Sequence, residues 1–242
     1  MTPKLSIVIV TYNPKNFFEK CIESIFSSSF KSFEIIVIDN NSKISNSLNK
    51  VLLKYPKIKF IQNKKNVGFA KANNQGIKLA RGKYILILNP DVILKKDTLL
   101  KSVNFMKKNK QARIMGCKLK NKINNKIEDS ARKFPTLKEL FFRRFLFKKS
   151  CDYPLMKISK PIQVDWVCGG FLFMRNKYLF DENYFLYFED VDLCRRVGNV
   201  FYNPNIEAIH TPQRKSKKNL KLFLIHLKSM IYYFKKWGWK FY

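Results

Sequence analysis

Acidic residues are scarce in this chain of 242 residues, which has 17 Asp and Glu against 48 Lys and Arg and a formal net charge of +31. Nucleic-acid-binding proteins use such an excess to neutralise phosphates. Here 39 of the basic residues are Lys and 9 are Arg, as codon bias produces in an AT-rich genome, and they are scattered along the chain. We therefore expect a solvated Lys-rich surface with some attraction to anionic surfaces, and no nucleic-acid partner. A basic nucleic-acid-binding module is the competing function.

Long apolar runs are also missing. No run approaches the roughly 18 residues that a helix needs to span a bilayer. The first apolar run, Leu5 to Val10, has no small-residue cleavage site behind it, so we expect no signal peptide. The expected location is the cytoplasm, including the cytoplasmic face of a membrane. With 46% hydrophobic and 15% aromatic residues, the chain has enough apolar material for a folded core.

Two kinds of short motif are absent. No C-x-x-C pair joins the five cysteines, which predicts reduced, mostly buried thiols rather than a zinc cluster or a thioredoxin-type site. Among the eight glycines, no G-x-G-x-x-G follows the first apolar run and no G-x-x-x-x-G-K-[ST] occurs. A dinucleotide oxidoreductase and a P-loop NTPase are therefore disfavoured. A bound nucleotide would need a metal ion to neutralise its phosphates.

Short β-branched runs alternate with helical patterns over the first hundred residues. The expected strands are 6–12, 33–39, 58–62 and 84–88, and the expected helices are 14–28, 69–80 and 97–108, the last capped by Asp97. Such alternation with short connections predicts an α/β fold with a mostly parallel central sheet and helices on both faces. Beyond residue 113 the pattern weakens, with strands expected at 114–119 and 200–202, an ordered stretch at 164–174 and a helix at 191–197.

Polar residues cluster where three of these strands end. The clusters are Thr11-Tyr12-Asn13, Asp39-Asn40-Asn41-Ser42 and Asn89-Pro90-Asp91. Asn, Asp and Ser also form ordinary turns, so one such loop says little. Three in phase at the carboxyl edge of a parallel sheet, where open α/β proteins bind ligands, predict a binding site there.

Five of the 17 acidic residues fall between positions 181 and 192: Asp181, Glu182, Glu189, Asp190 and Asp192. Crowded carboxylates raise the pKa of at least one member, which suits a general base. Acids at a helix N-terminus also complement the helix dipole, an alternative that explains one or two of the five. The string FLYFEDVD, an acidic cluster directly after an apolar-aromatic run, points beyond that alternative to a functional site.

Seven strings occur in order: SIVIVTYN, VIDNNS, NVGFAKANNQGI, LNPDV, WVCGGFLFMR, FDENYFLYFEDVDLCRR and AIH. In this order and spacing the chain resembles the family 2 inverting glycosyltransferases, in particular their bacterial rhamnosyltransferase-like branch, over about Leu5 to His210. The resemblance implies a GT-A fold and transfer of a sugar, with rhamnose as one candidate, from a nucleoside-diphosphate donor. The donor would be a dTDP- or UDP-sugar. The acceptor would be a saccharide or a polyprenyl-linked saccharide in surface-polysaccharide synthesis.

The same resemblance implies a donor site. Residues at the end of the first strand match family residues that line the base. Residues at the end of the second strand match those that read the pyrimidine or ribose. Residues 66–74 match the loop and helix over the nucleotide. The implied nucleotide-sugar residues are Thr11, Tyr12, Asn13, Asp39, Asn40, Asn66, Gly68, Asn73, Asn74 and Asp91. Asp91 matches the metal ligand of the family's D-x-D motif and His210 a histidine near that metal. A divalent ion, Mg²⁺ or Mn²⁺, would bridge Asp91 and the diphosphate.

The resemblance also implies the catalytic residues. Glu189 and Asp190 match the acidic pair that supplies the base for attack by the acceptor hydroxyl. We favour Asp190 and keep Glu189 as the alternative. The residues assigned to the acceptor and sugar pocket are Trp166, Gly169, Gly170, Asp192 and Arg196. For Trp166 a plain core aromatic is an equal expectation.

The expected domain organisation is a GT-A domain over 1–215 and a basic, aromatic helical extension over 216–242. Within the domain, residues 1–110 would bind the nucleotide sugar and 111–215 the acceptor. Basic residues stand beside bulky aromatics both at 141–149 and in the extension. This composition suits a helix lying on an anionic membrane surface. It equally suits aromatics that pack on the domain while their Lys neighbours point outward.

Overall fold

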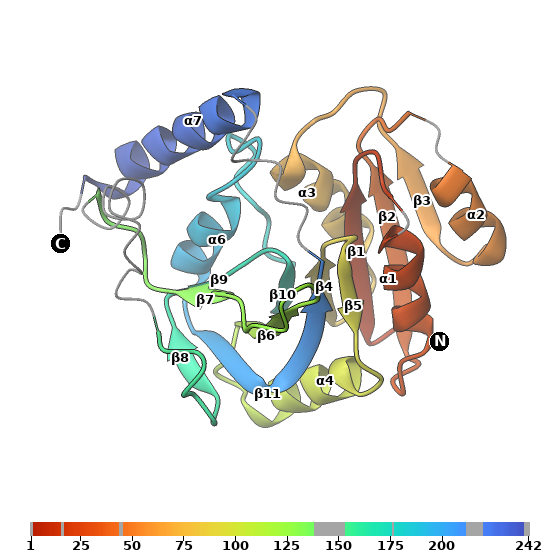
Figure 1. The fold of residues 1–242 in the computed structure, drawn as a ribbon, viewed down its shortest axis with the longest axis horizontal. Helices are drawn as coiled ribbons and strands as arrows, with labels where there is room; N and C mark the ends of the chain where they lie inside the picture. The colour runs from red at the N-terminus through yellow and green to blue at the C-terminus, as the bar shows by residue number, and fades with distance from the viewer. Residues whose placement is uncertain are drawn as a thin grey trace.

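The computed structural model describes residues 2–15, 17–43, 46–137, 153–175, 177–211 and 220–239. Its centre is one twisted sheet with helices on both faces (Figure 1). The strands of this sheet are β1 (Leu5–Thr11), β2 (Phe33–Asp39), β3 (Lys59–Gln62), β4 (Tyr84–Leu88), β5 (Val92–Leu94), β6 (Ile114–Asn121), β8 (Ile162–Val164), β10 (Phe171–Met174) and β11 (Val200–His210). The helices are α1 (Phe17–Phe26), α2 (Asn46–Lys54), α3 (Phe69–Leu79), α4 (Thr98–Lys108), α6 (Glu189–Val197) and α7 (Leu220–Trp237).

The strand order is β3-β2-β1-β4-β10-β6-β11-β5, with β8 paired to β11. The first four strands are parallel, and β10 runs antiparallel between β4 and β6. Two short strands, β7 (Ala131–Arg132) and β9 (Trp166–Val167), form a separate antiparallel ladder. The prediction of an α/β fold with a mostly parallel central sheet is confirmed. One continuous sheet includes strands from both expected halves of the domain.

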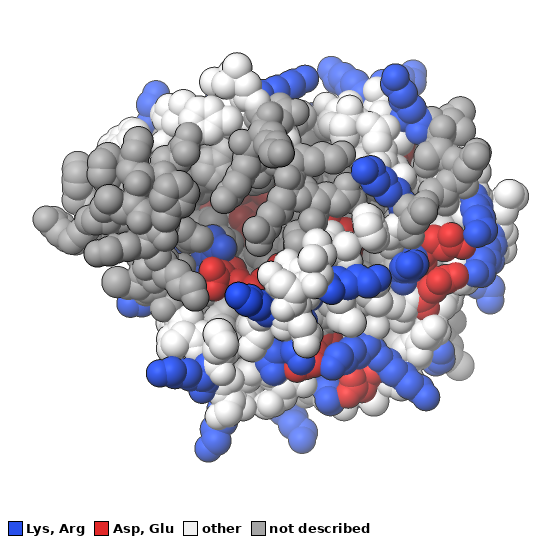
Figure 2. Space-filling model, viewed as in Figure 1, with Lys and Arg blue, Asp and Glu red and all other residues white. Residues whose placement is uncertain are grey.

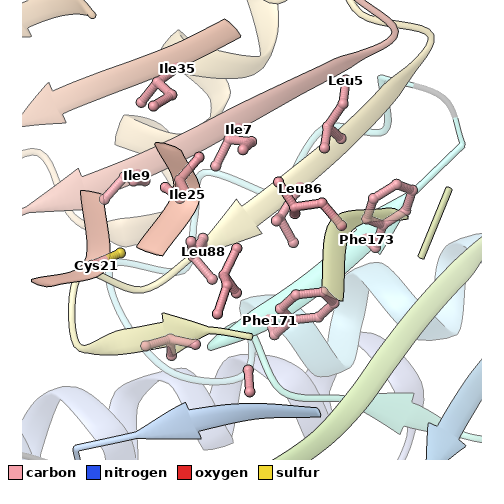
Figure 3. Close-up of a cluster of buried hydrophobic side chains, with 14 of the residues drawn as sticks. Leu5, Ile7, Ile9, Cys21, Ile25, Ile35, Leu86, Leu88, Phe171 and Phe173 are labelled. Carbon is pink, nitrogen blue, oxygen red and sulfur yellow. The ribbon is translucent and has the colours of Figure 1, made fainter. Parts of the chain in front are cut away.

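Side chains that alternate along the strands build a core on each face of the sheet. Leu5, Ile7 and Ile9 of β1 lie in the core under α1, α2 and α4, together with Leu86 and Phe173 (Figure 3). Neighbouring positions such as Val8 and Ile36 point to the other face, which α3, α6 and α7 cover. Because both faces are covered, the central strands are apolar at almost every position.

The structure differs from the sequence expectation in three elements. α2 lies in a segment for which no helix was expected, and its residues Leu48 and Val51 complete one core. β11 extends to His210 rather than ending at Tyr202, because it pairs with β6, β5 and β8. Asp97 stands at the N-cap of α4, but its side chain makes no capping hydrogen bond.

Charge and cysteine follow the expected pattern. Basic side chains are spread over the face seen in Figure 2 rather than gathered over one element. Cys21, Cys117 and Cys194 are buried free thiols, and Cys168 is partly buried. Cys151 and the segment 141–149 lie outside the described residues. Among the helices of the described ranges, none is both long and apolar enough to cross a membrane.

Candidate functional site

A cavity of about 530 Å³ opens at the carboxyl ends of β1, β2 and β4. The sheet edge forms one wall, as the strand-end clusters predicted. Segments from the second half of the chain form the other. The predicted donor residues that line it are Tyr12, Asn40, Asn66, Gly68 and Asp91. From the second half come Gly169, Gly170, Glu189, Asp190 and His210.

Asn40 organises the donor side of the cavity. Its side-chain amide donates to Asn66 Oδ1 at 2.9 Å and to the Gly68 carbonyl at 3.1 Å, and its Oδ1 accepts the Val67 N–H at 3.0 Å. These bonds hold the loop before α3 against the end of β2. Tyr12 stands beside them with a side chain 57% exposed, so its ring is free to stack on a planar ligand.

Gly68 is the point where the two walls of the cavity touch. Its φ is +88°, and a Cβ built there would lie 2.5 Å from the carbonyl oxygen of Phe185. The neighbouring Phe69 N–H donates to that same oxygen at 2.7 Å. Glycine is therefore needed here both for its backbone conformation and for the close approach of the Phe185 segment.

We expect Gly68→Ala to destabilise the protein more than the matched change Gly198→Ala. Gly198 also has a positive φ, +67°, but a Cβ there meets nothing within 4 Å. Both glycines combine a positive φ with a ψ near 180°, so the control isolates a conformational penalty of about 1–3 kcal/mol, to which Gly68→Ala adds the clash with Phe185. Denaturant unfolding of both variants measures the difference. Equal losses would contradict the close approach.

Three predicted donor residues lie beside the cavity rather than lining it: Thr11 and Asp39 are buried, and Asn13 is exposed. Asp39 accepts the Ser42 N–H at 2.9 Å, the Ser42 hydroxyl and the Gln62 amide at 3.3 Å. Thr11 is bonded to Asp39, and the Asn13 N–H donates to Ser42 Oγ at 2.7 Å. These contacts fix the turn after β2. Reading of the base or ribose by Asp39 stays a prediction.

Asn73 and Asn74 on α3 are also buried away from the cavity surface. Asn74 donates to the Phe180 carbonyl at 2.9 Å and to Glu182 at 3.0 Å, and accepts the Phe180 N–H at 2.8 Å. Asn73 donates to the Phe69 carbonyl at 2.9 Å. Asn74 thereby joins α3 to the segment that leads into the acidic cluster. Asn74 therefore contributes to the site by positioning this segment rather than by lining the cavity.

The other end of the sheet edge holds Asp91, His210 and Glu128. His210 Nε2 lies 3.5 Å from Asp91 Oδ1, and its Nδ1 lies 2.6 Å from Glu128 Oε2. Burial by itself lowers the pKa of His210, but the two adjacent carboxylates of Asp91 and Glu128 outweigh that effect and raise the pKa to about 9. Glu128 was not predicted from sequence, because it lies in a Lys/Asn-rich loop without a motif.

This end of the cavity fits a hard divalent cation. Asp91 Oδ1 is buried and has no hydrogen-bond partner in the described part of the chain. Over those same residues, no group of three or more His, Cys, Asp and Glu side chains is placed to enclose a metal. Mg²⁺ is commonly held by one or two protein groups, with phosphate oxygens and water completing the shell. The Asp91 carboxylate is suitable for that arrangement, and His210 could join it only after losing the proton that its raised pKa favours.

The acidic pair stands at the first turn of α6. Asp190 Oδ2 accepts the Gly169 N–H at 2.9 Å, and Oδ1 accepts the Val191 N–H at 2.9 Å. Glu189 is buried, and its Oε2 has no hydrogen-bond partner among the described residues. Gly169 thus belongs to the site through its backbone.

The two carboxyl groups differ in how they are stabilised. Burial, and then the neighbouring Asp190, raise the pKa of Glu189 well above its usual range. Burial also raises the pKa of Asp190, but the two backbone donors and the charge of Arg132 oppose that rise. The pKa of both carboxyl groups is raised, but within the described residues only Asp190 has backbone donors from other residues and a nearby cation that favour its charged form.

Arg132 is a cavity residue that sequence reasoning missed. It lies on β7, opposite Trp166 of β9, and its guanidinium stands 5.5 Å from the centre of the Trp166 ring. Trp166 itself packs against the core and donates to the Lys133 carbonyl at 2.7 Å. No local pattern distinguished Arg132 from the other basic residues, since its place depends on a short ladder between distant segments.

Asp192 and Arg196 were assigned to the acceptor pocket, but the structure does not bring them to the cavity. Asp192 is fully buried and accepts hydrogen bonds from Arg196 Nε at 2.7 Å and from Trp237 Nε1 at 2.9 Å. Residues two apart on a helix point about 200° apart, so Asp190 and Asp192 face opposite sides of α6. Asp192 joins α6 to α7 instead, and Arg196 binds Asp192 and the Leu179 carbonyl.

Comparisons with known proteins agree on one family. The sequence profile described as "Glycosyl transferase family 2" matches residues 6–180. The chain is 29% identical to rhamnosyltransferase WbbL of Escherichia coli K12, over 94% of this chain and 91% of WbbL. It is 31% identical to an uncharacterized glycosyltransferase of Methanocaldococcus jannaschii, over 67% of this chain and 59% of that protein.

Solved structures show the same fold. TarS of S. aureus in complex with UDP matches with a TM-score of 0.62 at 17% identity, over 94% of this chain and 65% of TarS. GalNAc-T7 with UDP, GalNAc and Mn²⁺ matches with a TM-score of 0.68 at 15% identity, over 88% of this chain and 44% of that one. The chain thus spans less than two thirds of either structure.

Proposed function

Because this chain belongs to glycosyl transferase family 2 and has the GT-A fold, we propose that it moves a sugar from a dTDP- or UDP-sugar to a saccharide or polyprenyl-linked acceptor. Rhamnose is the proposed sugar, and surface-polysaccharide synthesis is the proposed role. The observation that carries the proposal is the cavity with Asp91 and His210 at one point of its lining and the Glu189–Asp190 pair at another. The relationship to rhamnosyltransferase WbbL supports the choice of sugar.

The donor half of the cavity is suited to a nucleoside diphosphate. The exposed ring of Tyr12 can stack on a base, and the amides of Asn40 and Asn66 lie along the same wall. Asp91 and His210 would hold Mg²⁺ or Mn²⁺, which when bound offsets the charge of the departing diphosphate. No glycine-rich phosphate loop is present, which is consistent with neutralisation by a metal.

Asp190 is the proposed general base. A base must be ionised at the working pH and must reach the hydroxyl that it deprotonates. The Gly169 and Val191 N–H groups oppose the rise in the pKa of Asp190 that burial causes, and they fix its orientation at the cavity surface. The acceptor oxygen would attack the anomeric carbon as its proton passes to Asp190 and the diphosphate departs from the opposite face. One displacement of this kind inverts the anomeric centre.

Arg132 would tune this base, so we expect Arg132→Gln to shift the acidic limb of the pH profile of kcat/KM to higher pH. The positive charge of Arg132 lowers the pKa of Asp190, so its loss lets that pKa rise. The base is then protonated over a wider acidic range. The control is Lys133→Gln, which removes an exposed charge one residue away and outside the cavity lining. Identical limbs for the two variants would contradict the influence of Arg132.

A panel of nucleotide sugars tests the proposed function. Purified protein is incubated with dTDP-rhamnose, UDP-glucose, UDP-galactose and UDP-GlcNAc, with and without Mn²⁺, and binding and diphosphate release are measured. Metal-dependent binding of one donor class supports the proposal and names the nucleotide. Binding of random-sequence DNA at physiological salt, without binding of any donor, would favour the competing nucleic-acid-binding function.

A further inference from the structure

α7 presents two different faces. Its inner face is buried on the domain through Ser229, Tyr233 and Phe234. Its outer face carries apolar side chains in the open: Leu220 is 72% exposed, Leu224 55% and Ile231 37%. These three positions are four and seven residues apart, so they form one stripe along the helix. A helix that merely packed on the domain would have polar residues there.

Lysines continue the same stripe. Lys228 and Lys235 are exposed and lie four residues beyond Leu224 and Ile231, respectively. The 18 residues of α7 include four Lys and no Asp or Glu. Lys236 is the inward-facing member, bonded to Asp181 at 2.7 Å and Asp192 at 2.8 Å. The outer face therefore combines exposed apolar side chains with charges that are all positive.

We propose that this outer face of α7 docks on an anionic membrane surface. Apolar side chains between Lys residues match a headgroup layer, where Leu and Ile enter the acyl boundary and Lys meets phosphate. A second copy of the chain would bring the same positive charges face to face, in a protein whose net charge is already +31. Charge complementarity thus selects a lipid surface as the occupant.

The docking helix also contacts the wall of the active-site cavity. Ser229 Oγ donates to the Leu186 carbonyl at 2.8 Å, and the His226 ring lies 5.1 Å from Tyr187 and 5.3 Å from Phe188. Leu186 and Tyr187 line the cavity, and Phe188 immediately precedes the acidic pair. Figure 1 shows α7 at the periphery of the molecule, next to α6. Docking would hold the cavity beside the membrane, where a lipid-linked acceptor resides, and this consequence rests on the proposed function.

Co-sedimentation with vesicles tests the docking independently of catalysis. The full chain is mixed with vesicles of phosphatidylcholine, alone or with phosphatidylglycerol, at low and high salt. We expect pelleting that requires the anionic lipid and weakens with salt. The combined change Leu220→Ser, Leu224→Ser and Ile231→Ser should weaken vesicle binding at least about tenfold. Lys228→Gln with Lys235→Gln should weaken it about 25-fold.

Matched variants separate this face from general charge and hydrophobicity. Leu53, Leu79 and Leu100 are exposed on α2, α3 and α4, and their change to Ser should leave vesicle binding unaltered. Lys107→Gln with Lys108→Gln on α4 provides the charge control. The proposed docking face is wrong if the α7 variants pellet like wild type. It is also wrong if the control variants lose as much vesicle binding as the α7 variants. Circular dichroism confirms that each variant is folded.

Discussion

Asp190→Asn is expected to lower kcat by about two to four orders of magnitude while the affinity for the sugar donor stays unchanged, because a positioned general base contributes about this much to turnover. The Asn side chain keeps the size of Asp190 and one acceptor oxygen for the Gly169 N–H, so the fold and the donor half are preserved. Single-turnover kinetics with the identified donor measures the rate, and calorimetry measures the affinity. Loss of donor binding in the same proportion as turnover would contradict the assignment.

Glu189→Gln is the matched variant for this experiment. Burial raises the pKa of Glu189 well above its usual range and so favours its neutral form, and Gln is a neutral side chain of the same shape. We therefore expect a smaller loss of turnover than in Asp190→Asn. If Glu189→Gln loses two or more orders of magnitude while Asp190→Asn does not, Glu189 is the base and our assignment of roles is reversed.

Asp91→Ala is expected to abolish the Mn²⁺-dependent part of nucleoside-diphosphate binding and to leave the fold intact. The Asp91 carboxylate is the proposed ligand of the cation, and its partner His210, 3.5 Å away, keeps its contact with Glu128 in the variant, so the fold should persist. Binding of UDP and dTDP with Mn²⁺ and with a chelator gives the metal-dependent increment, which should fall at least about tenfold. Thermal unfolding checks that the domain remains folded.

Asp97→Ala is the control for Asp91→Ala. Asp97 is an acidic residue close in sequence, but it pairs with Lys101 on the surface of α4 and does not line the cavity. It should keep the full metal-dependent increment. An unchanged increment in Asp91→Ala would show that this carboxylate does not hold the metal, and the metal-binding role would have to be assigned elsewhere.

The parallel half of the fold was predictable because its signals are local. A β-branched run followed by a polar cluster, repeated at residues 11, 39 and 89, predicts both the strands and the edge at which they end. The acidic cluster at 181–192 was predictable for the same reason, since crowded carboxylates stand out in a basic chain, and the family resemblance singled out Glu189 and Asp190 within it. The structure brings both signals to one cavity.

Some polar residues at the strand ends line the cavity, and others are buried beside it. The sequence alone could not predict which residues belong to which group. Asn40 and Asp39 are neighbours in one cluster, yet Asn40 lines the cavity while Asp39 is buried under Ser42 and Gln62. Asp39 is the last residue of β2, and Asn40 is the first residue beyond the strand. Which of the two lines the cavity depends on α3 and its preceding loop, which are folded over it.

Sequence by itself determined the α/β class, the strand ends and the acidic cluster, because periodicity and residue type act over a few neighbouring positions. Tertiary structure decided the rest. Arg132 enters the cavity through a ladder with Trp166, Glu128 reaches His210 across 82 positions, and Asp192 turns away to bind Trp237 of α7. These contacts join residues far apart in the chain. Their partners are chosen by how sheets and helices pack, and no local pattern encodes that choice.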